Sequence, residues 1–395
     1  MYINKLNIHK ERNMNHASPK QIGDYNKSQM LSILRERGPT SRVELSRLLG
    51  ISQTAVTRNT SKLLKNGIIR ECGAENSHMG RKPVLIELCG DFCYVLGADI
   101  VGGTVRVALA DLLGNIVKSY EESIHREKGA QAVLEQLLAA LRNAVAEAGV
   151  AREKIWVAII GSPGIFDPEA GKSQFTFFLD GWDDFDIRSS AFDVLSIETI
   201  IENDVNLDII GESWKNEGNY ESILYVKLGQ GLAARVVLHG KLLRGKHKMA
   251  GEIGYMVPGF SSEKTLNYEN RLCNDAVAQK YAGLGGSGKA KTISDICSLA
   301  DGGDETARAV VSYLLDEFAV VLLNSAAVLD PQLIILGGEA CCFGEKEIAE
   351  LKQKIERHLP LSQDIVPSRL DKKACLYGAI KMGLDRVEER ITEIW

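Results

Sequence analysis

Apolar positions between Thr40 and Arg70 recur with the spacing of two short helices separated by a single glycine. We expect the first helix to begin at a capping box of Ser41 and Glu44 and to end at Gly50. Ser52 caps the second helix, which Asn66-Gly67 ends. The residues expected to face inward are Val43, Leu45, Leu48, Leu49, Ile51, Ala55, Val56, Leu63 and Leu64. This pattern predicts a helix-turn-helix, although an ordinary helical hairpin is the alternative.

The flanking segments extend this prediction to a winged helix over residues 18–90, preceded by a flexible leader at 1–17. Ser18-Pro19 is typical of a helix start, and Gly38-Pro39 marks where that helix ends. Residues 68–70 and 84–88 have the composition of two short strands, and the polar segment 73–83 joins them as a wing.

Two groups of residues in this domain are candidates for DNA contact. The first turn of the second helix carries short hydrogen-bonding side chains and one arginine, the types that contact base edges and phosphates: Ser52, Gln53, Thr54, Thr57 and Arg58. Arg81 and Lys82 end the wing and are suited to a narrow minor groove. A merely solvated charged loop is the alternative for the wing.

The charged residues are distributed unevenly between the winged-helix region and the rest of the chain. Residues 1–90 carry 15 lysines and arginines against 7 aspartates and glutamates, whereas the other 305 residues carry 32 against 45. A basic head favours contact with phosphates, and the acidic body is expected to stay away from DNA.

Composition narrows the class of protein. The chain has 395 residues, of which 45% are hydrophobic and 25% are charged, as in a globular protein of two or three folding units. We find neither a signal peptide nor an apolar run approaching a membrane span, so we expect a cytoplasmic protein. The eight cysteines lack paired C-x-x-C spacing and are expected to be reduced thiols that bind no metal.

From residue 92 onward the pattern alternates strands with helices, which predicts an α/β body. A group of strands and a long helix is expected first, at 94–100, 105–110, 115–119, 130–148 and 155–160. A similar theme recurs later in strands at 223–228, 235–238 and 332–338. Two such lobes would enclose a cleft for a small polar ligand.

Six segments in order carry a resemblance to a known family. They are LGADIVGGTVRVALADLLGNI at 96–116, GSPGIFD at 161–167, IENDVN at 201–206, LGQGL with HGKL at 228–242, AGEIGYMV at 250–257 and VLDPQLIILGG at 328–338. With the winged helix before them, they resemble the repressor members of the ROK family (repressors, open reading frames, sugar kinases). The resemblance implies a two-lobed, actin-like (ribonuclease H-like) sugar kinase fold. Its first lobe would span 91–205, completed by a C-terminal helix at 376–395, and its second lobe 206–375.

The chain departs from the kinase members in both phosphate-binding loops. Val101 and Gly103 replace a glycine and a threonine in the first loop, and Gln230, Ala233 and Arg235 replace a threonine and two glycines in the second. Phosphate-holding turns need bare backbone, and we expect the bulk of Arg235 to stand where a nucleotide would approach. The substitutions predict that the body is not an enzyme and binds no cofactor.

The resemblance also assigns a sugar site that this chain partly keeps. Four residues match family positions that contact the sugar: Gly164, Asn203, Asp204 and Glu252. The aspartate that Asp204 matches also serves as the general base in the kinase members. The family's zinc knuckle is absent, because Tyr255 replaces its histidine and no cysteine follows before Glu269, which matches the closing glutamate. Tyr255 and Glu269 are nevertheless predicted to border the sugar site as well. Phe178 replaces a sugar-binding asparagine. Solvated loop carboxylates or helix caps are the alternative for the acidic residues.

These observations predict a DNA-binding repressor of carbohydrate-utilisation genes, controlled by a sugar or sugar derivative held between the lobes. A homodimer or tetramer on a palindromic operator is expected from the motif's geometry and the resemblance. Three alternatives stay open. They are an ATP-dependent sugar kinase with a DNA-binding head, a ligand-independent repressor with a decayed pocket, and an activator of the same architecture.

Overall fold

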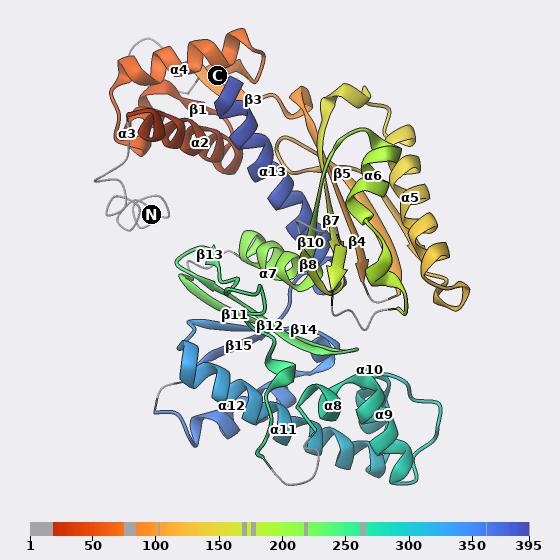
Figure 1. Cartoon of the computed structure of the whole chain (residues 1–395). Coiled ribbons are helices and arrows are strands. Elements are labelled where there is room, and N and C mark those ends of the chain that lie inside the picture. Colours follow the sequence, from red (N-terminus) through yellow and green to blue (C-terminus); the bar gives the residue numbers. More distant parts are fainter. Residues whose placement is uncertain are drawn as a thin grey trace.

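A computed structural model describes residues 19–74, 84–101, 103–167, 172–174, 179–216, 220–260, 266–360 and 362–394. The chain forms a small helical head and two α/β lobes, with the last helix, α13 (Ala374–Ile394), running from the first lobe to the head (Figure 1). Short 3-10 turns connect several elements: η1 Gly90–Phe92, η2 Arg126–Lys128, η3 Arg152–Lys154, η4 Trp182–Asp184, η5 Ile253–Tyr255, η6 Glu339–Cys342 and η7 Asp371–Lys373.

The head is a winged helix-turn-helix, as predicted. Its helices are α2 (Pro19–Arg37), α3 (Arg42–Leu49) and α4 (Gln53–Lys65), and its sheet has the order β1 (Thr40–Ser41), β3 (Val84–Leu88), β2 (Ile69–Ala74). Gly50 ends α3 with φ +65°, the left-handed conformation that a glycine adopts without strain.

Two details of the predicted helix start are wrong. Ser41 does accept a hydrogen bond from the Glu44 N–H at 3.3 Å, but Glu44 turns its carboxylate to Arg47 instead of back to Ser41, so the capping box is only half formed. Val43 is 57% exposed rather than part of the buried stripe, because the stripe of this two-turn helix is centred on Leu45.

The first lobe is built on a five-stranded sheet of order β10-β7-β4-β5-β6. Antiparallel β4 (Tyr94–Val101), β5 (Thr104–Asp111) and β6 (Ile116–Ser123) are followed by β7 (Ile155–Ser162) and β10 (Glu198–Asn203), which run parallel to β4. Helices α5 (Ala130–Glu147) and α6 (Ile187–Leu195) cover one face, and α7 (Asp204–Lys215) and α13 cover the other (Figure 1). A short hairpin of β8 (Ile165–Asp167) and β9 (Lys172–Gln174) follows β7.

The second lobe repeats this plan with a sheet of order β13-β12-β11-β14-β15. Its strands are β11 (Ser222–Leu228), β12 (Leu232–Leu238), β13 (Lys241–Leu242), β14 (Leu333–Gly338) and β15 (Asp364–Pro367). Its helices are α8 (Glu269–Leu272), α9 (Asn274–Gly283), α10 (Ile293–Asp301), α11 (Glu305–Leu329) and α12 (Glu345–Glu356). The predicted strands are confirmed to within a few residues at their ends.

The sequence-based expectation that no apolar run approaches the length of a membrane span is wrong for helix α11. Among the described helices it alone has the length and composition of such a span. It is nevertheless half buried inside the second lobe, where Leu314, Phe318 and Leu322 lie in the core. The core helix of a globular protein meets the same criteria, and these buried residues identify α11 as a core helix of the second lobe.

Helices α7 and α13 approach each other closely through two glycines. A Cβ atom on Gly378 would lie 1.9 Å from the Leu207 carbonyl oxygen, and one on Gly211 would lie 2.2 Å from the Ala374 carbonyl oxygen. Neither backbone carbonyl can move away without shifting its helix, so the crossing requires glycine at both positions.

Gly378→Ala is therefore expected to lower the free energy of unfolding by at least about 1–3 kcal/mol, the usual cost of overpacking. Urea denaturation of the full chain measures this change. Gly23→Ala is the matched control, because Gly23 is also helical but a methyl group added there would have no neighbouring atom within 4 Å. The control should be neutral or slightly stabilising. Equal losses in both variants would contradict the close-packing argument.

The head and the first lobe share one hydrophobic core. Met30, Leu34 and Leu63 of the head belong to the same buried cluster as Leu384 and Ile391 of α13. A buried ion pair between Arg35 and Glu388 reinforces the contact, and Arg35 Nε donates to the Leu112 carbonyl at 2.9 Å. The head is thus part of the body's core and is not attached to it only through a linker.

Candidate functional site

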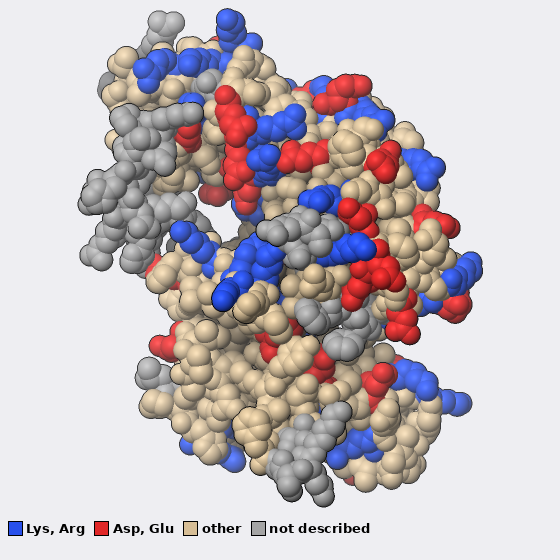
Figure 2. Space-filling model, in the orientation of Figure 1, with Lys and Arg blue, Asp and Glu red and all other residues tan. Residues whose placement is uncertain are grey.

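The predicted DNA-contact residues of α4 lie on the surface. Ser52, Gln53, Thr54, Thr57 and Arg58 are all exposed, and the Ser52 hydroxyl also caps the helix by accepting from the Ala55 N–H at 3.2 Å. Exposed Lys62 and Lys65 follow toward the end of the helix, and Figure 2 shows basic side chains along the outer side of the head. Arg81 and Lys82 lie outside the described residues.

A second group of predicted residues meets at the start of α7, where the two lobes join. Asn203 caps this helix by accepting from the Asn206 N–H at 3.0 Å. Its Nδ2 donates to the Gly164 carbonyl at 2.8 Å and to Asp204 Oδ1 at 3.3 Å. Three predicted sugar-site residues, from β10, α7 and the turn after β7, therefore lie in direct contact.

Arg235 of β12 connects this group to Glu252. Its guanidinium is 2% exposed and donates to Glu252 Oε1 at 2.6 Å, to Asn206 Oδ1 at 2.8 Å and to Asn203 Oδ1 at 3.2 Å. We expected Arg235 to obstruct a nucleotide. The side chain instead points into the predicted sugar site, where it neutralises Glu252, so the expected position of Arg235 is wrong.

A lysine neutralises Asp204 in the same manner. Lys227 Nζ of β11 lies 2.9 Å from Asp204 Oδ2 and 2.8 Å from Asp208 Oδ2. Burial alone would lower the pKa of Lys227, but the two carboxylates outweigh it and raise that pKa. Burial raises the pKa of Asp208 to about 6 despite the lysine. Lys227 was not among the residues predicted from the sequence. A lysine inside the apolar strand at 223–228 is nevertheless a signal of a buried acidic partner.

Tyr255 and Glu269 border this group on the side of the second lobe. Glu269 accepts from the Leu232 N–H at 3.2 Å, and burial, with the nearby Glu252 charge, raises its pKa. Tyr255 is 49% exposed, and burial followed by the charges of Glu269 and Glu252 raises its pKa. All six predicted sugar-site residues therefore lie in one region. Phe178 is outside the described residues.

A further buried pair lies behind this region, where Asp99 of β4 accepts from Arg106 Nη1 of β5 at 3.0 Å. Asp99 is fully buried, and its Oδ2 has no hydrogen-bond partner among the described residues. Burial raises the pKa of Asp99 from its ordinary 3.8 to about 7, against the opposing effect of Arg106.

This raised pKa predicts a pH dependence of stability. Between pH about 4 and 7 the folded chain keeps a proton on Asp99 that the unfolded chain has released, so the free energy of unfolding falls as pH rises through this window. Asp99→Asn removes the titration. The stability of the wild type relative to this variant should therefore decline from pH 5 to pH 7 in denaturation curves. A constant difference would contradict the assignment.

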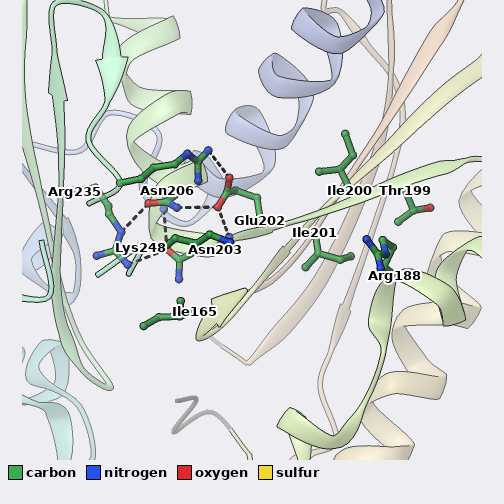
Figure 3. A pocket seen from close by; sticks show the side chains of 11 residues that line it. Ile165, Arg188, Thr199, Ile200, Ile201, Glu202, Asn203, Asn206, Arg235 and Lys248 are labelled. Atoms are coloured by element: carbon green, nitrogen blue, oxygen red, sulfur yellow. Dashed lines mark hydrogen bonds and ion pairs between the residues drawn. The ribbon is translucent and has the colours of Figure 1, made fainter. Parts of the chain in front are cut away.

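The structure also contains a cavity of about 310 Å³ beside the edge strand β10 (Figure 3). Of the predicted sugar-site residues, Asn203 lines it, together with Ile165, Arg188, Thr199, Ile200, Ile201, Glu202, Asn206, Arg235, Arg244 and Lys248. Arg188, Arg244 and Lys248 were missed because they stand outside the family motifs. Arg244 and Lys248 belong to the basic run of 244–248, which is a sequence signal for these two residues, whereas Arg188 stands outside it.

The two turns that correspond to phosphate loops contain side chains as well as glycines. Val101 packs against the core of the first lobe, and Gly103 has φ +80°. In the β11–β12 turn the Gly229 N–H donates to the Gly231 carbonyl at 3.0 Å, so one amide is used within the turn. No cluster of three metal-ligating side chains occurs in the part of the chain that the structure describes.

Comparison with known proteins identifies the family of both parts of the chain. The ROK family model matches residues 95–385, and a model of winged helix-turn-helix DNA-binding domains matches residues 24–70. The chain belongs to the ROK family.

Among curated relatives, it is 26% identical to the xylose repressor of Caldicellulosiruptor bescii, over 93% of this chain and 96% of that protein. A ROK family transcriptional regulator described as a homologue of the E. coli MLC protein has the same fold. The TM-score is 0.78 at 20% identity, over 94% of this chain and 98% of the other. The body alone resembles the ROK glucokinase of Streptomyces griseus, with a TM-score of 0.62 at 20% identity over 73% of this chain and 99% of that one.

Proposed function

We propose that this ROK protein is a cytoplasmic transcriptional repressor of carbohydrate-utilisation genes that responds to a carbohydrate bound by its body. The observation that carries the proposal is the common core of a helix-turn-helix head and a ROK body. The xylose repressor that it resembles over nearly its whole length supports the choice of repressor.

The fold provides a direct connection between ligand and DNA. Asn203 begins α7, α7 packs tightly on α13 through Gly211 and Gly378, and α13 packs on α2 of the head. A ligand that binds one lobe arrangement better than another shifts this helix pair and with it the head. A coupling free energy of about 1–3 kcal/mol would change operator affinity roughly 5- to 150-fold.

We also propose that the body transfers no phosphate. A general base must be free to accept a proton from the substrate hydroxyl, but Asp204 is held by Lys227 at 2.9 Å. The side chains of Val101 and Gln230 in the turns that correspond to phosphate loops support the same conclusion. Steady-state ATP turnover in the presence of sugars is the test, and sugar-dependent turnover above background would restore the kinase alternative.

We propose that two heads of a homodimer bind the two halves of a palindromic operator. Arg58→Ala should then weaken operator binding by about 1–3 kcal/mol, because an exposed arginine near the start of a recognition helix contacts base or phosphate. Fluorescence anisotropy with operator DNA at two salt concentrations measures the loss. Arg152→Ala, an exposed arginine of the body, is the control and should leave affinity unchanged. Unaltered affinity of Arg58→Ala would contradict the assigned DNA surface.

A reporter gene placed behind the operator separates the remaining alternatives. Deletion of the protein should raise reporter expression if it represses and lower it if it activates. A repressor that ignores every carbohydrate would support the decayed-pocket alternative.

A further inference from the structure

Two of the eight cysteines meet in the second lobe. All eight are free thiols in this structure, but Cys297 Sγ of α10 and Cys342 Sγ of η6 lie 3.1 Å apart, within hydrogen-bond distance. We propose that this pair is a redox-modification site, at which hydrogen peroxide forms a reversible disulfide. The proposal goes beyond the proposed function and does not depend on it, because it concerns only the chemistry of the second lobe.

Helix α10 and the turn η6 are already aligned at this point. Ser294 lies three residues before Cys297, and its N–H donates at 3.1 Å to Glu339, which lies three residues before Cys342. The two elements therefore contact each other at two positions of equal spacing. The sulfur atoms would approach by about 1 Å to reach the disulfide length of about 2.0 Å, which is a movement of side-chain atoms and not of whole elements.

The two thiols are suited to different steps. Cys342 is half-buried, whereas Cys297 is only 8% exposed. The hydrogen bond between them lowers the pKa of Cys342 in spite of burial and raises the pKa of Cys297, so Cys342 loses its proton first. Because a thiolate is the nucleophile toward peroxide, Cys342 is the attacking residue and Cys297 is the resolving one.

The oxidation takes place in two steps. The Cys342 thiolate attacks one oxygen of hydrogen peroxide, the O–O bond breaks, and the departing hydroxide takes up the proton that Cys342 released, leaving a sulfenic acid. The Cys297 thiol then attacks the sulfenic sulfur, so that the S–S bond forms and the S–O bond breaks. The hydroxyl group leaves with the Cys297 proton as a second water. The two sulfur atoms lose two electrons, which the peroxide gains, and a dithiol reverses the change.

The surroundings of the pair favour a small oxidant. Cys297 belongs to the hydrophobic core of the second lobe, and Cys342 packs against that core. A bulky disulfide such as oxidised glutathione would have to open this packing, and the charges of Glu339 and Glu347 near Cys342 would repel its carboxylates. Hydrogen peroxide is small and uncharged. The sulfenic acid then reacts with a thiol held beside it, which is faster than reaction with a thiol from solution.

The disulfide would restrain a defined part of the second lobe. Its two cysteines are 45 positions apart, and α11 and β14 lie between them. It would also fix the elements beside the β11–β12 turn, since a Cβ atom on Gly229 would lie 3.6 Å from Glu339 Cγ. From the other side, the Asn274 N–H donates to the Gly229 carbonyl at 2.7 Å, and Asn274 Oδ1 accepts from the Ile293 N–H of α10 at 2.9 Å.

Peptide mapping of the full-length protein tests the proposal. Reduced protein is treated with hydrogen peroxide, free thiols are blocked with N-ethylmaleimide, and tryptic peptides are analysed by mass spectrometry. We expect a linked pair of peptides that contain Cys297 and Cys342 and that dithiothreitol separates. The link should form about tenfold or more faster in the folded protein than in concentrated urea, because only the fold holds the thiols together. Oxidation should also raise Tm by about 4 °C or more.

Three variants assign the two roles. Cys342→Ala should form no link, and Cys297→Ala should accumulate a sulfenic acid on Cys342 that dimedone labels. Cys341→Ser is the matched control, because Cys341 is the neighbour of Cys342 but its Sγ donates to the Leu336 carbonyl at 3.5 Å. This control should keep the link and the rise in Tm.

Three results would overturn the proposal. They are a wild-type protein that forms no link in the folded state, a link that disappears in Cys341→Ser but persists in Cys342→Ala, and cross-linking only between chains on a non-reducing gel. The first result would mean that the two thiols only pack against each other. The wild-type measurement alone decides this point if a variant fails to fold.

Discussion

Arg235→Met is expected to lower the free energy of unfolding by about 3–5 kcal/mol, because it leaves Glu252 as a charge without its 2.6 Å partner and removes a donor from both Asn203 and Asn206. Methionine has a similar length and fills most of the space, so the loss reports the missing charge and hydrogen bonds more than a cavity. Urea denaturation followed by far-UV circular dichroism measures it.

Arg308→Met is the control for this variant. Arg308 also pairs with a glutamate, Glu305, at 2.7 Å, but both side chains are more than half exposed. Its loss should cost about 1 kcal/mol or less. A comparable loss in both variants would show that burial of the Arg235 network contributes little, and the structural interpretation of the site would fail.

Arg35→Met is expected to have an effect of the same size at a different place. The Arg35 and Glu388 side chains are 8% and 6% exposed, and removing the arginine leaves the carboxylate buried between α2 and α13. We expect a loss of about 3–5 kcal/mol in the contact between head and body. Hydrogen exchange should show faster exchange of the α2 amides, while the amides of α11 in the second lobe stay protected.

The double variant Arg35→Met/Glu388→Met distinguishes charge from packing. With both charges replaced by apolar side chains, much of the stability should return, since no unpaired carboxylate remains. A double variant as unstable as Arg35→Met alone would mean that the hydrogen bonds to Leu112 and Ser28, and not the ion pair, hold the head.

Sequence patterns predicted the elements well because their signals are local. Ser41, Gly50 and Ser52 mark the ends of the head's helices by their own backbone chemistry, and the apolar runs of β4 and β11 are long enough to identify buried strands. The attachment of the head was not predictable in the same way. It depends on contacts between α2 and α13, which are more than 350 residues apart in the sequence. The sequence of neither helix indicates that the other is its partner.

The site was predicted in position but not in charge state. Asn203, Asp204 and Glu252 were found by motif, yet motif comparison treats each residue separately and cannot show that Lys227 and Arg235 neutralise two of them. Arg235 was noticed as a departure, but which face of β12 it occupies depends on strand register, which only the sheet determines. The basic residues of the β10 cavity come from three separate segments, so no single window contains their signal.

The core shared by α2 and α13 has a consequence for how the protein is made. The head is synthesised before the body, but its surface at Met30 and Leu34 is covered by residues of α13, such as Leu384 and Ile391, which are made much later. A nascent or truncated chain therefore has a head without its support on the body. Until α13 has been made, the DNA-binding helices of the head lack the contacts that fix them relative to the lobes.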